Sequence, residues 1–155
     1  MSFGYTGATQ EPIEVDELSQ WPTLSTALFR QHRRIPEFFE EQALADSLTR
    51  SAMEVQQQLI EYAHSADRDV PFAVAIDPAS GLPFAELSEQ QQSVYRGAVY
   101  ARSHADLLGY FSAVDQREAG NNKATDTEQQ DAILGQSNRA VRLLLGLGRS
   151  GVHAL

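Results

Sequence analysis

The stretch ALADSLTRSAMEVQQQLIEY, residues 43–62, decides the fold class of this chain. Its apolar residues recur every three or four positions, so a helix would place them on one face. The members of this stripe are Leu44, Leu48, Ala52, Val55, Leu59 and Tyr62. We therefore predict an amphipathic helix of about 25 residues, from near Gln42 to near Ser65, whose stripe faces a core.

Another helix is predicted before this one. Trp21 and Pro22 would open it, because proline is well tolerated at the first position of a helix. Its apolar face would consist of Leu24, Leu28 and Ile35. A basic cluster lies at its C-terminal end, where positive charge suits the helix dipole. The cluster comprises Arg30, Arg33 and Arg34.

A third helix is predicted from Ser88 to about Gln116. Ser88 and Gln91 have the spacing of a capping box, in which each side chain bonds the backbone N–H of the other residue. The stripe along this helix is narrow and rich in small residues, which permits close approach of a neighbouring helix. Its members are Val94, Ala98, Ala101, Ala105, Leu108 and Ser112.

A fourth helix is predicted after a polar loop over residues 116–128. Thr127 and Gln130 would cap its start, and Gly146 would end it in the left-handed conformation that glycine adopts easily. The residues on one face of this helix would be Ile133, Ser137, Ala140 and Leu144.

Residues 70–87 form an apolar insertion between the second and third helices. Phe72, Val74 and Ile76 alternate as in a strand, and the following DPASG sequence favours a turn. We predict a packed loop or a short hairpin here.

The summed prediction is a mainly α protein, a helical bundle of three to four helices with this loop insertion and extended N- and C-terminal arms. The bundle would occupy residues 21–146, the acidic N-terminal arm residues 1–20 and the C-terminal docking tail residues 147–155.

The composition is that of one globular domain, with 42% hydrophobic residues among 155 and a net charge of −9. No apolar run approaches the roughly 18 residues of a membrane span. The first residues lack the pattern of a signal peptide, and no cysteine is present for a disulfide, a thiolate zinc site or a nucleophile. We expect a chain made and kept in a cytoplasm, or in an assembly formed there. Its negative charge disfavours tight DNA binding but suits a wall that DNA passes without sticking.

We find no pattern for a catalytic, cofactor or metal site, and we predict that the chain is not an enzyme. His104 and Asp106 come nearest to a ligand pair, but residues two positions apart on a helix point apart. Residues 146–151 match the letters GxGxxG, yet they follow a helix and open none. An acidic group near a helix start fits a solvated cluster better than a catalytic carboxylate site. It consists of Glu37, Glu40 and Glu41.

Residues 128–155 carry the clearest indication of a partner. No acid follows Asp131, and the sequence runs into GLGRSGVHAL, which is too apolar for free solvent and too short and glycine-rich to form a core. Segments of this kind usually dock on another chain by strand addition or in a groove. We interpret this one as a docking device; the alternative is a frayed terminus without a role.

The order of these pieces resembles the head-completion (head–tail connector) proteins of tailed bacteriophages with contractile tails. The likeness spans roughly residues 20–150. It rests on residues 43–62, residues 94–110 around YRGAV, and NKATD at residues 122–126 leading into the RAVR of residues 139–142. The apolar segment from Pro71 to Pro83 departs from the family pattern.

The resemblance implies a virion protein of the neck, which forms a ring of twelve copies beneath the portal. The ring would extend the DNA channel and present a surface to the next connector or tail protein, and heterologous contacts would close it. The implied partners are therefore the portal protein, other copies of this chain and the next connector or tail protein. DNA would pass through the lumen without specific binding. No cofactor and no membrane would take part.

Candidate contact residues follow from this resemblance. For docking to the portal we predict Arg139, Arg142, Arg149, Val152 and Leu155. For contacts between subunits we predict the helix faces around Tyr95, Tyr110 and Phe111. The alternative for each of these aromatic side chains is burial in the core of its own chain.

Three other functions stay open. A small acidic helical protein that sequesters a basic partner or mimics DNA would share this composition, although its acids are scattered along the sequence. A stopper or tail terminator is a second alternative, although such proteins are richer in strands. A hydrolase would need an unrecognised carboxylate pair that includes Glu37 or Glu41.

Overall fold

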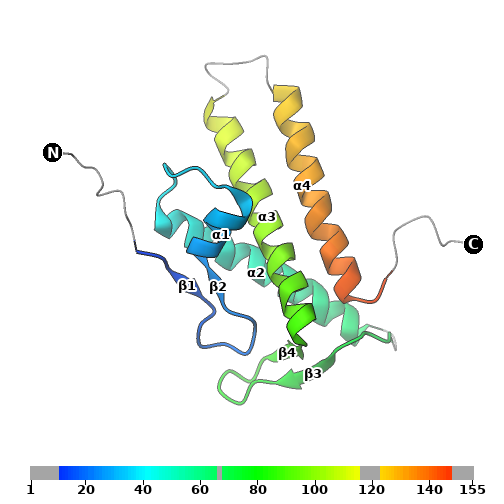
Figure 1. Cartoon of the computed structure of the whole chain (residues 1–155). Helices are drawn as coiled ribbons and strands as arrows, with labels where there is room; N and C mark the ends of the chain where they lie inside the picture. Colours follow the sequence, from blue (N-terminus) through cyan, green and yellow to red (C-terminus); the bar gives the residue numbers. More distant parts are fainter. Residues whose placement is uncertain (1–10, 66–67, 116–122, 148–155) are drawn as a thin grey trace, which may run out of the picture.

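The computed structural model describes residues 11–65, 68–115 and 123–147 (Figure 1). Within them the chain forms four helices and four short strands, so the predicted mainly α fold is confirmed. The helices are α1 (Thr26–Arg33), α2 (Glu41–His64), α3 (Glu89–Asp115) and α4 (Lys123–Leu144). The strands form two antiparallel pairs, β1 (Glu14–Val15) with β2 (Leu24–Ser25) and β3 (Ala73–Ile76) with β4 (Pro83–Glu86). None of the described helices combines the length and apolarity of a membrane span.

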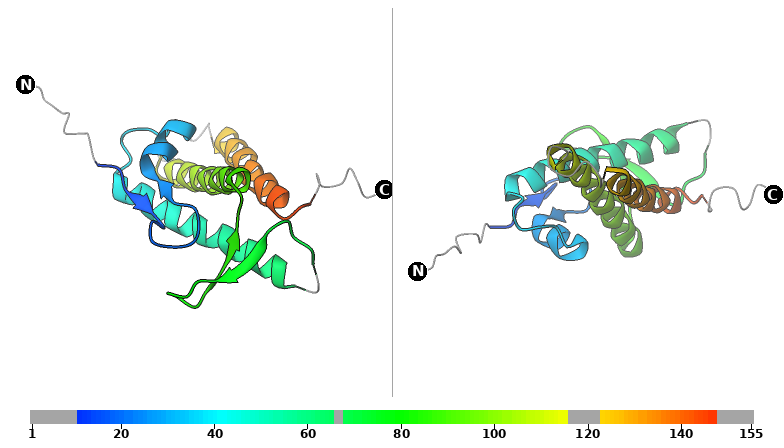
Figure 2. Two further views of the ribbon diagram at one scale, coloured as in Figure 1. Left: turned by 60° about the horizontal axis from the view of Figure 1, so that its bottom comes forward. Right: turned by 90° about the horizontal axis from the view of Figure 1, so that it is seen from above.

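The core lies where α2 crosses the antiparallel pair of α3 and α4 (Figure 2). The predicted stripe of α2 is confirmed, because its apolar side chains are buried from Leu44 to Leu59 and Tyr62 is half-buried. Aromatic side chains complete the core from the other elements. They are Trp21, Phe29, Phe39, Tyr95 and Tyr100.

The helix predicted to open at Pro22 begins instead at Thr26. Ser25 Oγ accepts hydrogen bonds from the backbone N–H groups two and three residues later, at 3.2 and 3.4 Å, and so satisfies donors at the helix start. The predicted apolar face is wrong at its centre, because Phe29 is fully buried whereas Leu28 is 40% exposed. Pairing of β2 with β1 and this serine cap outweigh the preference of proline for a helix start.

Part of the predicted N-terminal arm belongs to the folded domain. Residues 11–20 contain β1 and a turn, whereas residues 1–10 lie outside the described part of the chain. Val15 is buried, and Asp16 Oδ2 accepts a hydrogen bond from Gln56 Nε2 at 2.9 Å. The turn after β1 is therefore fastened to α2.

The insertion between α2 and α3 is a hairpin, one of the two alternatives predicted. Its tip is closed by hydrogen bonds from Asp77 N to Leu82 O (2.9 Å) and from Gly81 N to Asp77 O (2.7 Å). Gly81 has a φ of +74°, which glycine adopts without strain. The capping box that follows is confirmed: Ser88 N donates to Gln91 Oε1 at 2.8 Å, and Gln91 N to Ser88 Oγ at 3.2 Å.

The small-residue stripe predicted on α3 packs against α4. Ala98, Ala101 and Ala105 are buried there. Ser137 Oγ of α4 donates to Ala98 O at 2.7 Å, and Arg102 Nε of α3 donates to Ser137 Oγ at 3.2 Å. Small side chains let the two backbones approach closely enough for these bonds.

The two ends of α4 differ in how well the sequence predicts them. The helix begins at Lys123, so Thr127 lies inside it and the predicted cap is wrong. The side chain of Gln130 contacts another helix instead, since its Nε2 donates to Ala105 O of α3 at 3.0 Å. The predicted end is confirmed, since Gly146 has a φ of +78° and its N–H donates to the helix at 3.1 Å. The N–H after it bonds the carbonyl five residues earlier at 2.9 Å, which completes a Schellman motif.

Candidate functional site

The described residues hold no group of three or more His, Cys, Asp or Glu side chains placed to bind a metal ion. Of the acids predicted to form a solvated cluster, Glu41 is buried, and that prediction is wrong for this residue. Its Oε1 accepts a hydrogen bond from Arg30 Nε at 2.7 Å, and Arg30 also bonds the carbonyls of Pro36 and Phe39. The arginine offsets the cost of burying the carboxylate and fastens α1 to the start of α2.

His104 and Asp106 point apart on α3, as predicted, and serve different contacts. His104 Nδ1 accepts a hydrogen bond from Arg33 Nε at 3.1 Å. Burial and the positive charge of Arg33 lower the pKa of His104 from 6.5 to about 4, so the imidazole is neutral near pH 7. Asp106 Oδ2 pairs with Arg50 at 3.0 Å. His104 therefore links α3 to α1, and Asp106 links α3 to α2.

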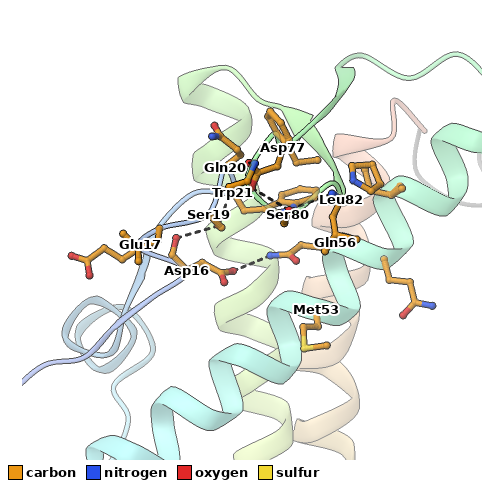
Figure 3. Close-up of a pocket in the computed structure, with 16 residues that line it drawn as sticks. Asp16, Glu17, Ser19, Gln20, Trp21, Met53, Gln56, Asp77, Ser80 and Leu82 are labelled. Atoms are coloured by element: carbon orange, nitrogen blue, oxygen red, sulfur yellow. Dashed lines mark hydrogen bonds between the residues drawn. The ribbon is translucent and has the colours of Figure 1, made fainter.

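A large open cleft lies on the outer side of α2 (Figure 3). We call it the acidic cleft; its volume is about 1040 Å³. One wall is the turn after β1, the floor is α2, and the other wall is the tip of the β3–β4 hairpin. The lining residues are 16–21, Met53, Gln56, Gln57, Ile60, Asp77, Ala79, Ser80 and 82–84.

The wall and floor of the acidic cleft are joined through one side chain. Gln56 Nε2 donates to Asp16 Oδ2 in the turn and to the hydroxyl oxygen of Tyr95, both at 2.9 Å. Tyr95 in turn stacks on Trp21 with ring centroids 5.5 Å apart. Burial raises the pKa of Tyr95, so its hydroxyl stays protonated. This network holds the turn in one place above α2.

The surface of the acidic cleft combines apolar side chains with negative charge. Leu18, Met53 and Leu82 are 96%, 63% and 65% exposed. Within the described part of the chain, every charged residue that lines the cleft is acidic, namely Asp16, Glu17 and Asp77. Such a surface favours an apolar partner that carries positive charge.

A second hollow, of about 510 Å³, lies where α4 ends beside the end of α2. Of the residues predicted to dock on the portal, Arg142 lines this hollow and Arg139 is exposed on α4. The apolar residues beside Arg142 in it are Val141, Leu145 and Leu147. The other three predicted docking residues lie outside the described residues. They are Arg149, Val152 and Leu155.

The three aromatic residues predicted at subunit contacts have different places. Tyr95 is fully buried, so its side chain belongs to the core, as the intramolecular alternative predicts. Tyr110 is 66% exposed near the far end of α3. The side chain of Phe111 lies outside the described part of the chain.

The sequence does not predict the acidic cleft. Met53 lies off the buried stripe of α2, and Leu18 and Leu82 lie in turns. Large apolar residues outside the buried helical stripes are the sequence signal that could have indicated an exposed apolar surface. Nothing in the sequence, however, says that these three residues lie around one hollow.

Comparison with known proteins gives two matches. A family model described as "Phage head completion protein (GPL)" matches residues 15–155. A protein of Haemophilus phage HP1 (strain HP1c1), described as "Probable head completion/stabilization protein", is 26% identical over 135 residues, which cover 87% of each chain. No solved structure matches. Because the family model covers nearly the whole chain, from β1 onward, this protein belongs to the phage head completion protein family, whose role is structural.

Proposed function

We propose that this head completion protein forms a ring of twelve copies beneath the portal, at the neck of the virion. The ring extends the DNA channel and offers the attachment surface for the next connector or the tail. The family match over residues 15–155 carries this proposal. The net charge of −9 supports it, since an acidic channel wall lets DNA slide without binding it.

The proposed portal-docking surface is the end of α4 together with the segment that follows it. Arg142 lines the hollow at this end, and Arg139 is exposed one turn earlier. Apolar residues around an arginine form a common kind of anchor at protein interfaces. Arg149, Val152 and Leu155 continue the same chemistry along the sequence. These residues therefore form one docking unit in the proposal.

The proposed contact between neighbouring copies uses the far end of α3, around Tyr110 and Phe111. Tyr110 supports this part, because a tyrosine that is 66% exposed offers a large amphipathic surface to a partner. Head-to-tail contacts of one kind form a ring when the rotation between copies closes, and an open helical filament when it does not.

The test is negative-stain imaging of the full chain mixed with portal assemblies, which should show added density beneath the portal. Deletion of Gly148 to Leu155 should abolish this density while the circular dichroism spectrum stays near that of the full chain, because α4 ends before the deletion. Arg139→Ala combined with Arg142→Ala should weaken docking, and Arg50→Ala, an exposed arginine of α2, is the control. A truncated chain that still adds density would contradict the docking role of this segment.

A further inference from the structure

The acidic cleft presents apolar surface that the described chain itself does not cover. Leu18 comes from the turn after β1, Met53 from α2 and Leu82 from the hairpin tip, and all three are mostly exposed. Single exposed apolar residues are ordinary, but several gathered around one hollow mark an interaction site. The cleft, of about 1040 Å³, is at the upper end of the range for small-molecule pockets and is open to solvent, so it can also admit a peptide segment.

The negative charge of the acidic cleft favours an occupant that carries positive charge. Among the described residues, three acids line the cleft and no Lys, Arg or His does. Asp77 is used in the hairpin turn, where it accepts hydrogen bonds from Ala79 N (2.9 Å) and Ser80 Oγ (3.2 Å). Glu17 is exposed and makes no hydrogen bond or ion pair with the described residues. Its carboxylate is therefore available to a cation.

The cleft is also formed before any partner arrives. Gln56 bridges the turn after β1 to buried Tyr95, and the hairpin tip is closed by its own hydrogen bonds. A preformed site avoids most of the entropy cost of ordering its walls when it binds. This distinguishes it from a loop surface that must fold around its partner.

We propose that the acidic cleft binds an extended peptide segment of the next protein in the connector, in which a Lys or Arg lies between apolar residues. The apolar residues cover Leu18, Met53 and Leu82, and the basic residue pairs with Glu17. This inference rests on the proposed function, which assigns the end of α4 to the portal. The two hollows lie on different faces of the same part of α2: Gln57 and Ile60 line the acidic cleft, whereas Gln58 and Glu61 line the hollow beside the end of α4. In this proposal, a portal docked at the end of α4 leaves the acidic cleft to the next component.

Photo-crosslinking in assembled particles tests the occupant. Benzoylphenylalanine in place of Leu18 should crosslink to a different virion protein, within a few residues of a Lys or Arg, when the product is mapped by mass spectrometry. Ile76, which is exposed but outside the cleft, carries the same group in the control and should give little of this product. Crosslinks from position 18 to a second copy of this chain, to the portal, or at no more than the control level overturn the proposal.

Joining of purified tails to DNA-filled heads tests the role. The double variant Glu17→Lys and Leu82→Ser should join tails at least tenfold less well, while the heads keep the protein bound and its circular dichroism spectrum is unchanged. Glu86→Lys with Ile76→Ser makes the same changes outside the cleft and should join tails normally. Normal joining by the cleft variant overturns this inference alone. Loss of the cleft variant from heads, with its fold intact, assigns the cleft to the portal or to neighbouring copies and overturns it as well. Absence of the unaltered chain from the neck overturns the proposed function instead.

Discussion

The two sides of α2 show how the molecule divides its apolar residues. Toward α3 and α4, the stripe that includes Leu48 is buried as far as Leu59, and the polar side chains of Ser137 and Arg102 form hydrogen bonds between α3 and α4. On the outer side, Met53 lies in the acidic cleft, whose apolar side chains are exposed to water. The inner side is buried within one chain, whereas the outer side exposes apolar surface that we propose another molecule covers. The proposed assembly uses both, a core that folds alone and a surface that a partner completes.

The largest expected difference between the two sides is in stability. Leu48→Ala should lower the free energy of unfolding by about 2–5 kcal/mol, because it leaves a cavity in the core. Met53→Ala, on the same helix but 63% exposed, should change it by less than about 0.5 kcal/mol. Urea denaturation followed by circular dichroism measures both. Equal losses would mean that the outer side of α2 also belongs to the core.

The close approach of α3 and α4 can be tested by adding volume. Ala105→Leu should lower the free energy of unfolding by about 1–3 kcal/mol, since the buried alanine has no space around it for three more carbons. Ala132→Leu, on the exposed face of α4, should change it by less than about 0.5 kcal/mol. Thermal and urea unfolding of the two variants give the comparison. A tolerated leucine at position 105 would show that the interface is looser than its buried alanines indicate.

Two glycines should respond to alanine with opposite sign. Gly146→Ala should cost about 1 kcal/mol of unfolding free energy, because φ is +78° and the new Cβ would lie 3.2 Å from Pro71 Cδ. Gly97→Ala should stabilise the protein by about 0.5–1 kcal/mol, since it lies inside α3 with open space around it. Urea unfolding resolves both changes. A stabilising Gly146→Ala would argue against the left-handed end of α4.

The effect expected from His104, which is partly exposed, is confined to acidic pH. Its pKa is lowered from 6.5 to about 4 by burial and by Arg33, so the unfolded chain binds more protons than the folded chain between these values. The contribution of His104 is present above pH 6.5 and is lost as the pH falls towards 4. His104→Gln keeps an acceptor for Arg33 and should reduce the dependence of unfolding free energy on pH in this window. An unchanged slope in the variant would mean that other groups cause it.

Local signals in the sequence predicted much of the fold. The stripe of α2, the capping box of Ser88 and Gln91 and the helix end at Gly146 are confirmed, because each depends on residues within one or two helical turns. The errors occur where a distant partner competes for a local group. Strand pairing moves the start of α1 to Thr26, and Ala105 O engages Gln130, which the sequence assigns to a cap.

The same distinction between local signals and distant contacts applies to the candidate site. The acid-free C-terminal segment and the family resemblance single out Arg139 and Arg142, whereas the exposure of Arg139 and the hollow that Arg142 lines are seen only in the structure. The burial of Tyr95 and Glu41 depended on which helices cross, and so did the acidic cleft. Leu18, Met53 and Leu82 are far apart along the chain, and only the packing of the turn and the hairpin over α2 brings them around one hollow. Residues that are near in sequence determine helical period and capping, whereas the chain topology determines which distant segments form one surface.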